Sequence, residues 1–200
     1  YEIRLCDWSS DVCSSDLGEV CTAPALPINN PSWSLPVINL TDKATCPSTA
    51  VSIGEPAAAG YSYLWSPPAG LNSTIIANPA ASITATSSYY VTKTDDGSGC
   101  KARDTVTVTV RSIDFDAGID RAVCNGATVR LGTVPGDSYT YSWTPVGAAW
   151  TNGTGPTDAQ PQVLFAGSTQ TFNVTITDPL TGCQKTDAVT LSSTVLAGRF

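Results

Sequence analysis

The strings "YSYLWSP" at residues 61–67 and "YTYSWTP" at residues 139–145 are two copies of one pattern. In both copies aromatic residues occupy every second position, and a proline follows the tryptophan strand. Alternation with a period of two is typical of a β-strand that buries one face. The proline ends the strand because it cannot donate to a sheet ladder. These two strands set the register in which the rest of the chain can be aligned.

The two copies stay aligned on both sides of these strands. "CPSTAVSIG" (46–54) matches "CNGATVRLG" (124–132), and "YYVTKTDDGSGC" (89–100) matches "FNVTITDPLTGC" (172–183). Differences in length fall only between the tryptophan and the second of these blocks, as expected of a surface loop. The chain therefore contains two copies of one unit with a period of about 80 residues.

Each copy is built from short strand signals. "DTVTVTV" (104–110) places valines on one face and threonines on the other, which indicates a half-buried strand. Thr, Ser, Val, Gly and Pro dominate the composition, and no helical period occurs. We therefore predict an all-β protein of two tandem antiparallel sandwiches, covering residues 38–112 and 113–196, with residues 18–37 as a linker or the remnant of a preceding repeat.

The first 17 residues are set aside from this reasoning. "DWSSDVCSSDL" (7–17) resembles the translation of a sequencing adapter, and the stretch has no strand or helix period. We interpret residues 1–17 as a disordered artefact of this kind. The alternative is a disordered acidic N-terminus. On the first interpretation the chain is a fragment of a longer gene.

The cysteines fit the repeat once Cys6 and Cys13 are set aside with that segment. The repeat predicts the bridges Cys46–Cys100 and Cys124–Cys183, one in each copy. Such bridges indicate an oxidising, extracytoplasmic compartment. Zinc would require paired C-x₂-C clusters, which the sequence lacks.

Cys21 is left over from this pairing scheme. It is either the last cysteine of a truncated preceding repeat or an unpaired thiol in a proline-rich linker. Both interpretations remain open at this stage.

Charge and composition exclude several classes of function. The net charge is −7 and there is no basic stripe, so nucleic acid is not an expected partner. The sequence has no histidine, which removes Ser-His-Asp and Cys-His catalysis and histidine-ligated metal sites. No apolar run is long enough for a transmembrane helix. We therefore expect no enzyme activity.

Three stretches carry a resemblance to a known family: "DAGIDRAVCNGATVRLG" (116–132), "YTYSWTP" (139–145) and "FNVTITDPLTGC" (172–183). They resemble the Ig-like or PKD-like repeats of large secreted Bacteroidetes proteins, among them cell-surface adhesins and gliding-motility-associated proteins. The resemblance implies Ig-like/PKD-like β-sandwiches used in tandem outside the cell. "WSPPAG" (65–70) and "WTPVGA" (143–148) replace the W-D-F-G-D-G-like stretch of PKD domains.

The tryptophans have two interpretations. Trp65 and Trp143 hold the same place in both copies, which favours a core residue packed on the disulfide over a ligand-stacking platform. Trp150 occurs only in the second copy, in "GAAWTNGTG" (147–155). It is the candidate for an exposed aromatic contact with a ligand.

The acidic residues are weighed in the same way. Asp114, Asp116 and Asp120 lie between the copies and could bind Ca²⁺, although a solvated linker with turn-capping residues explains them as well. Asp95 and Asp178 fit Asx turns, with a metal site as the alternative. We expect no other cofactor.

Together these observations predict a non-catalytic structural or adhesive repeat module of a bacterial extracellular or cell-surface protein. Its expected partners are neighbouring repeats and an unknown surface ligand, either a polysaccharide or a protein. The alternative is an accessory module, spacer or carbohydrate-binding, of a secreted glycoside hydrolase or protease.

Overall fold

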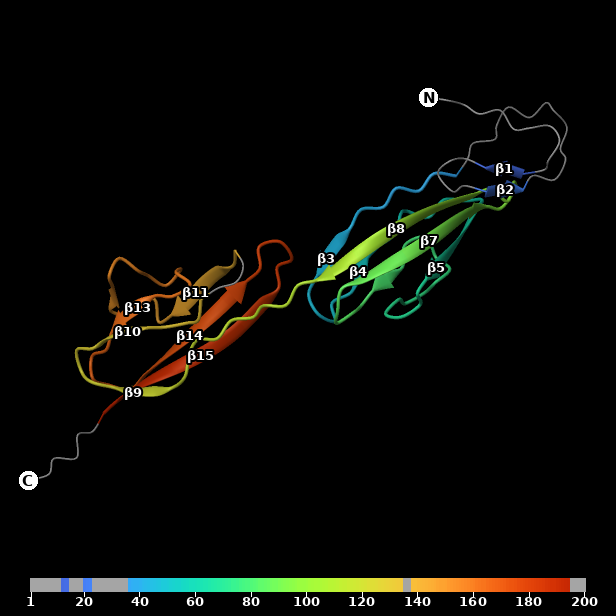
Figure 1. The fold of residues 1–200 in the computed structure, drawn as a ribbon. Helices are drawn as coiled ribbons and strands as arrows, with labels where there is room; N and C mark the ends of the chain where they lie inside the picture. The colour runs from blue at the N-terminus through green and yellow to red at the C-terminus, as the bar shows by residue number, and fades with distance from the viewer. Residues whose placement is uncertain (1–11, 15–19, 23–35, 135–137, 195–200) are drawn as a thin grey trace, which may run out of the picture. The chain divides into compact units, whose positions relative to one another are not determined.

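The computed structural model describes residues 12–14, 20–22, 36–134 and 138–194 (Figure 1). All regular structure in these ranges is β-strand, as predicted, and none of it is a helix that could span a membrane. The chain divides into two compact units, unit 1 at Tyr1–Val110 and unit 2 at Arg111–Phe200.

In each unit the two longest strands form one antiparallel hairpin, β7–β8 in unit 1 and β14–β15 in unit 2, which we call the central hairpin. Those of unit 1 are β1 (Val12–Ser14), β2 (Val20–Thr22), β3 (Lys43–Thr45), β4 (Val51–Ser52), β5 (Tyr61–Ser66), β6 (Ala80–Ala81), β7 (Ser87–Asp95) and β8 (Lys101–Val110). Those of unit 2 are β9 (Arg121–Val123), β10 (Thr128–Arg130), β11 (Thr140–Thr144), β12 (Trp150–Thr151), β13 (Gln162–Leu164), β14 (Gln170–Thr177) and β15 (Gln184–Ser193).

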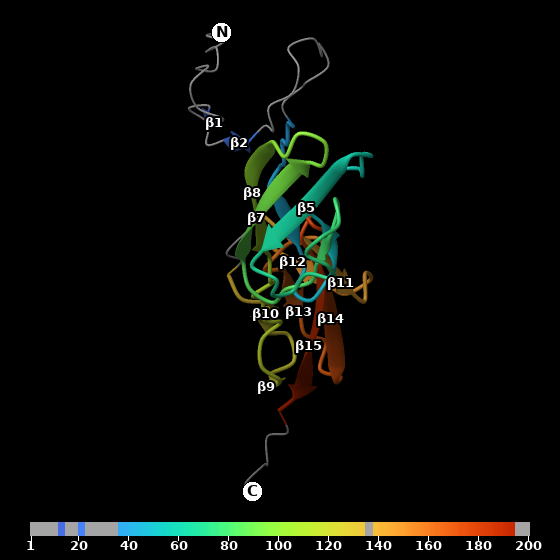
Figure 2. The ribbon, with the colours of Figure 1, turned by 90° about the vertical axis from the view of Figure 1, so that its right-hand side faces the viewer.

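Unit 1 pairs a four-stranded sheet, in the order β3-β8-β7-β5, with the two-stranded sheet β4-β6. Figure 2 shows β7 between β5 and β8. Within the larger sheet only the β3–β8 pair is parallel, and its register joins Thr45 to Val110. The C-terminal ends of β3 and β8 therefore lie side by side.

Unit 2 repeats this plan with the larger sheet β9-β15-β14-β11 and the smaller sheet β10-β13-β12. Again the short first strand runs parallel to the long last strand, with Val123 opposite Ser193. Two facing sheets of this kind, with a first strand parallel to the last, form an Ig-like β-sandwich.

The alternating strands bury the aromatic residues between the sheets of each unit. Trp65 is 2% exposed and Trp143 is fully buried. Each indole N–H donates to a backbone carbonyl, of Ile76 and of Asp158 respectively, so neither ring leaves a polar atom unsatisfied. Both tryptophans therefore belong to the cores.

The glycine eight residues after each first cysteine is explained by a close approach of two backbones. A Cβ on Gly54 would lie 2.0 Å from the Ala77 carbonyl oxygen, and one on Gly132 would lie 2.7 Å from that of Ala159. Gly132 also has a φ of +75°, which other residues rarely adopt. Only glycine fits at these two positions.

Two aspartates in each unit hold the parallel first strand in place. In unit 1, Thr107 N–H donates to Asp42 at 2.8 Å, and Leu40 N–H donates to Asp104 at 2.6 Å. The equivalent bonds of unit 2 run from Thr190 N–H to Asp120 and from Ala117 N–H to Asp187. The sequence shows that these aspartates recur, but not that they fasten a strand.

Part of the N-terminal segment is described as well. β1 and β2 pair antiparallel, with Cys13 opposite Cys21, so Val12–Ser14 is a strand within the segment expected to be disordered. The rest of residues 1–17 lies outside the described residues, and the interpretation of that segment as an artefact stays a prediction.

Candidate functional site

The tip of the β7–β8 hairpin is a closed hydrogen-bonded turn. Asp95 accepts from the backbone N–H groups of Gly97 (3.0 Å) and Ser98 (2.8 Å) and from the Ser98 hydroxyl (2.9 Å). The bonds from Ser98 hold the pKa of the Asp95 carboxyl below its usual value. All three bonds end on Oδ1, and they form the Asx turn that the sequence predicted.

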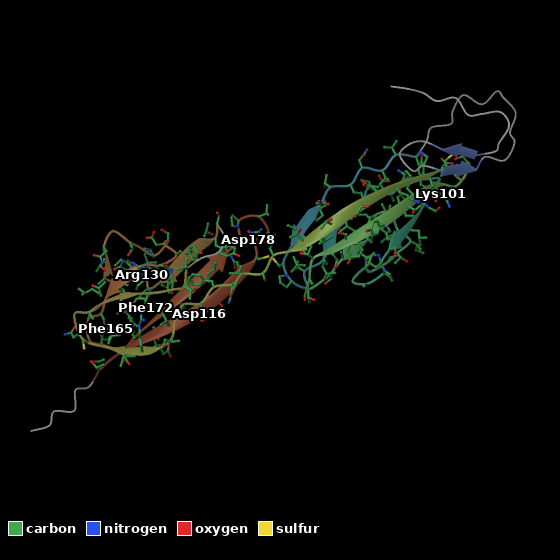
Figure 3. All side chains as sticks on the ribbon, viewed as in Figure 1. Lys101, Asp116, Arg130, Phe165, Phe172 and Asp178 are labelled. Carbon is green, nitrogen blue, oxygen red and sulfur yellow. The ribbon has the colours of Figure 1, made fainter. Side chains whose placement is uncertain are left out.

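The equivalent tip in unit 2 adds an ion pair. Asp178 is 1% exposed and accepts from Arg111 Nε at 2.5 Å, from Leu180 N–H at 2.9 Å and from the Thr181 hydroxyl at 3.1 Å. The Arg111 guanidinium, then these hydrogen bonds, lower the pKa of Asp178. In Figure 3, Asp178 and Phe165 lie at opposite ends of unit 2. Because Arg111 is the first residue of unit 2, the chain enters that unit beside this tip.

The predicted bridge Cys46–Cys100 is wrong. Cys46 follows β3, whose last residue Thr45 lies opposite Val110 at the end of β8, whereas Cys100 comes just before the start of β8. The ten residues of β8 separate the two cysteines, and at about 3.3 Å per residue the gap is roughly 30 Å. A disulfide needs Cα atoms within about 7 Å.

The predicted bridge Cys124–Cys183 is wrong for the same reason. Cys124 follows Val123, opposite Ser193 at the end of β15, and Cys183 precedes β15. Cys124 is an exposed free thiol, while Cys183, like Cys46 and Cys100, is disulfide-bonded.

The error has a physical source. The expected bridges assumed that both cysteines of a copy face each other across the core, as in antibody domains. The parallel first strand instead places the two cysteines of a copy at opposite ends of its longest strand. No described cysteine belongs to either core cluster, so the tryptophans do not pack on a disulfide. The Cys21 side chain lies outside the described residues.

Trp150 is less exposed than the sequence suggested. It is half-buried in β12, its ring meets Phe172 edge-on at 5.9 Å, and its indole N–H donates to the Val146 carbonyl oxygen at 2.9 Å. These contacts make it part of the packing of unit 2, and its role as a ligand contact stays a prediction.

The candidate calcium ligands have separate tasks. Asp116 accepts from Gly118 N–H at 2.6 Å, Asp120 accepts from Thr190 N–H at 2.7 Å, and Asp114 is exposed. Among the residues with described positions, no three His, Cys, Asp or Glu side chains are grouped as a metal site would need. The calcium hypothesis therefore gains no support from geometry.

A buried ion pair in unit 1 was not predicted. Lys93 is 7% exposed, its Nζ lies 2.7 Å from Glu55 Oε1, and it donates to the Val37 carbonyl oxygen at 3.0 Å. The Tyr63 hydroxyl donates to the same Glu55 oxygen at 2.8 Å, and the ammonium lies 4.5 Å from the centre of the Tyr61 ring. Burial first, and then Glu55, raise the pKa of Tyr63 to about 12. All of these groups hold one another, which suits a structural role.

In unit 2 the equivalent backbone carbonyl, that of Phe115, accepts a hydrogen bond from a lysine on the neighbouring strand. Ile176 stands at the place of Lys93, and Lys185 Nζ donates to the Phe115 carbonyl oxygen at 2.8 Å. Ile176 and Lys185 are cross-strand partners, as are Lys93 and Ala102 in unit 1. The two units therefore place the lysine on different strands but bind the equivalent carbonyl with it.

Two surface hollows lie at equivalent places on the central hairpins of the two units. One spans Tyr90–Thr92 and Arg103–Thr105, and the other spans Asn173–Thr175 and Thr186–Ala188. The aspartate in each, Asp104 or Asp187, already accepts a backbone N–H. Neither hollow gathers an acid, base and nucleophile within reach of one another.

No family model matches the chain, and no curated protein matches it. Solved structures do. Extracellular domains 3–5 of Drosophila OTK match at 12% identity with a TM-score of 0.44, over 78% of this chain and 60% of that one. The N-terminal eight Ig domains of Down Syndrome Cell Adhesion Molecule match at 14% identity with a TM-score of 0.46, over 80% of this chain and 24% of that one.

A SusE-like surface-located polysaccharide-binding protein from the heparin utilisation locus of Bacteroides thetaiotaomicron matches at 15% identity with a TM-score of 0.33. The match covers 77% of this chain and 33% of that one. The chain thus spans 60% or less of these three proteins. At such identities the likeness concerns the fold alone.

Proposed function

We propose that the chain is a non-catalytic structural or adhesive segment of an extracellular multidomain protein. The observation that carries this proposal is the path of the chain through unit 2. The chain enters beside the hairpin tip, where Arg111 meets Asp178, and leaves at Ser193 after the full length of β15. Entering at one end and leaving at the other suits a unit that joins others in series.

The polar groups support a structural role. Asp95, Asp178 and the Glu55–Lys93 pair are all bound to groups within their own unit. Disulfide-bonded cysteines favour an oxidising compartment, outside the cytoplasm. The stretches that resemble Bacteroidetes repeats make a bacterial surface or secreted protein the proposed setting.

The second candidate is a carbohydrate-binding accessory module of a secreted hydrolase. Its specific support is the outer face of unit 1, where Leu64 and Tyr90 are 62% and 60% exposed and Arg103 lines the hollow. Exposed aromatic residues are common contacts for ligands.

Affinity electrophoresis of the full chain in gels that contain soluble polysaccharides separates the two candidates. The structural proposal predicts unchanged mobility, and no sugar released in a parallel hydrolysis assay. Retardation that disappears in Tyr90→Ala but persists in Trp150→Ala would favour the accessory module instead. Sugar release by the chain would contradict both.

A further inference from the structure

One exposed face of unit 1 is formed by alternate residues of β5, β7 and β8, because the residues between them point into the core. On this face Leu64 and Arg103 lie opposite Thr92 on its two sides, and Tyr90 is a neighbouring residue of β7. Lys101, labelled in Figure 3, is the neighbour of Arg103 on β8. We call the surface formed by these side chains, without the small Thr92, the basic face.

The two cations of the basic face have no opposite charge beside them. Within the described part of the chain, neither Lys101 nor Arg103 forms an ion pair. The alternate residues of β5, β7 and β8 that share this face include no acid. Leu64 and Tyr90 add exposed apolar surface between the strands that carry them. Positive charge beside apolar surface favours an occupant that is itself acidic and partly apolar.

The equivalent face of unit 2 has none of these features. Its counterparts of the four side chains are uncharged and polar, namely Ser142, Asn173, Gln184 and Thr186. The same sandwich therefore forms with a neutral face, so folding does not require the cations and apolar side chains of the basic face. They are better explained by a contact that unit 1 makes with another molecule.

A segment of unit 2 carries the opposite charge. Asp114, Asp116 and Asp120 are exposed, and Ile119 among them is 77% exposed. We call residues 114–120 the acidic segment. The equivalent stretch of unit 1, residues 36–42, contains a single acid, Asp42. Each unit thus carries one of two surfaces that match in charge and in apolar character.

We propose that the basic face of one copy of this chain binds the acidic segment of a second copy. Lys101 and Arg103 pair with the carboxylates of the segment, while Leu64 and Tyr90 cover Ile119. Two copies that met through the same face would bring cations against cations, so the contact joins two different surfaces. The proposal rests on the proposed structural or adhesive function, which it extends from one chain to an assembly of chains.

Sedimentation velocity of the full chain tests this contact. All samples carry Cys124→Ser, so that the exposed thiol cannot link two chains. The chain should associate in a concentration-dependent manner at low salt and dissociate at about 0.5 M NaCl, because salt screens exposed charges. Lys101→Glu with Arg103→Glu should raise the dissociation constant by at least about tenfold. Asp114→Lys with Asp116→Lys should do the same.

Mixing these two double variants gives the sharper result. Alone, each variant sets like charges against each other. In an equimolar mixture the reversed face of one variant meets the reversed segment of the other, so association should return. The control is Gln184→Glu with Thr186→Glu, which alters the equivalent face of unit 2 and should leave association unchanged. Thermal unfolding followed by tryptophan fluorescence shows that each variant is folded.

A chain that stays monomeric at every concentration, or double variants that stay monomeric when mixed, would overturn the contact. Association that neither reversal weakens would also overturn it. A monomer that is retarded in polysaccharide gels through Lys101 and Arg103 would assign the basic face to an acidic polysaccharide instead. Sugar release would contradict the proposed function without changing the sedimentation result, so the two failures are distinguishable.

Discussion

At the residue scale, the two units solve one problem with different side chains. A lysine ammonium caps the carbonyl of Val37 or Phe115 in each, but it comes from β7 in unit 1 and from β15 in unit 2. Lys93 also needs Glu55, because a buried ammonium is costly without an opposite charge. In unit 2 the Tyr141 hydroxyl lacks this acceptor and has no hydrogen-bond partner among the described residues.

Lys93→Ile is therefore expected to lower the free energy of unfolding of unit 1 by about 2–4 kcal/mol, because it leaves Glu55 and the Val37 carbonyl without their partner. Adding Ala102→Lys recreates the arrangement of unit 2 and should recover part of the loss. Urea unfolding followed by tryptophan fluorescence measures both variants. A double variant no more stable than the single one would contradict the exchange of strands.

The Tyr63 hydroxyl gives unit 1 a defined response to alkali. Its folded pKa of about 12 exceeds its ordinary value of 10.0, so the neutral hydroxyl stabilises the fold below pH 10, and this contribution is lost as the pH rises toward 12. Unfolding free energies measured by urea titration from pH 9 to 12 should fall steeply in this window. Tyr63→Phe should flatten the fall, whereas Tyr90→Phe, at an exposed position, should leave it unchanged.

The tryptophans belong to this scale too. Trp143→Ala removes a fully buried side chain and should cost about 3–5 kcal/mol of unfolding free energy. Trp150→Ala, which removes a half-buried ring, should cost less. The two variants are compared by thermal unfolding under identical conditions. An equal loss would mean that Trp150 is as much a core residue as Trp143.

At the element scale, the hairpin tip of unit 2 depends on an ionised carboxylate. The pKa of Asp178 is lowered in the folded state, so its contribution is present above its ordinary value of 3.8 and is lost as the pH falls through the lower folded value. Urea unfolding between pH 6 and 2 should show this acid limb, and Asp178→Asn should flatten it. Asp114→Asn, at an exposed site, is the control, and an equal change in both variants would contradict the account.

The strands themselves were largely predictable, because alternation and turn residues are local signals. "DTVTVTV" became β8, and the aromatic alternation became β5 and β11. What failed depended on pairing between distant strands. β3 and β9 are three residues long, carry no alternation that could be recognised, and pair parallel with β8 and β15. These parallel pairings separate the two cysteines of each copy, so the disulfides expected from the sequence cannot form.

At the scale of the whole molecule, the candidate site could be predicted only in part. The repeat indicated which cysteines matter, and the Asx turns at Asp95 and Asp178 followed from local chemistry. Whether the two cysteines of a copy can bond to each other depends on which end of β8 or β15 each one reaches, and composition and spacing carry no information about that. The sequence also did not predict that Lys185 takes the role of Lys93, because the two positions become neighbours only when the strands pair.

Optical-tweezers extension of the full chain under reducing conditions, held at its two ends, tests the central claim most directly. The two compact units should unfold in two separate steps, each lengthening the chain by roughly 200–300 Å. A single step, or gradual lengthening without steps, would contradict the claim that two Ig-like units are the structural elements of this protein.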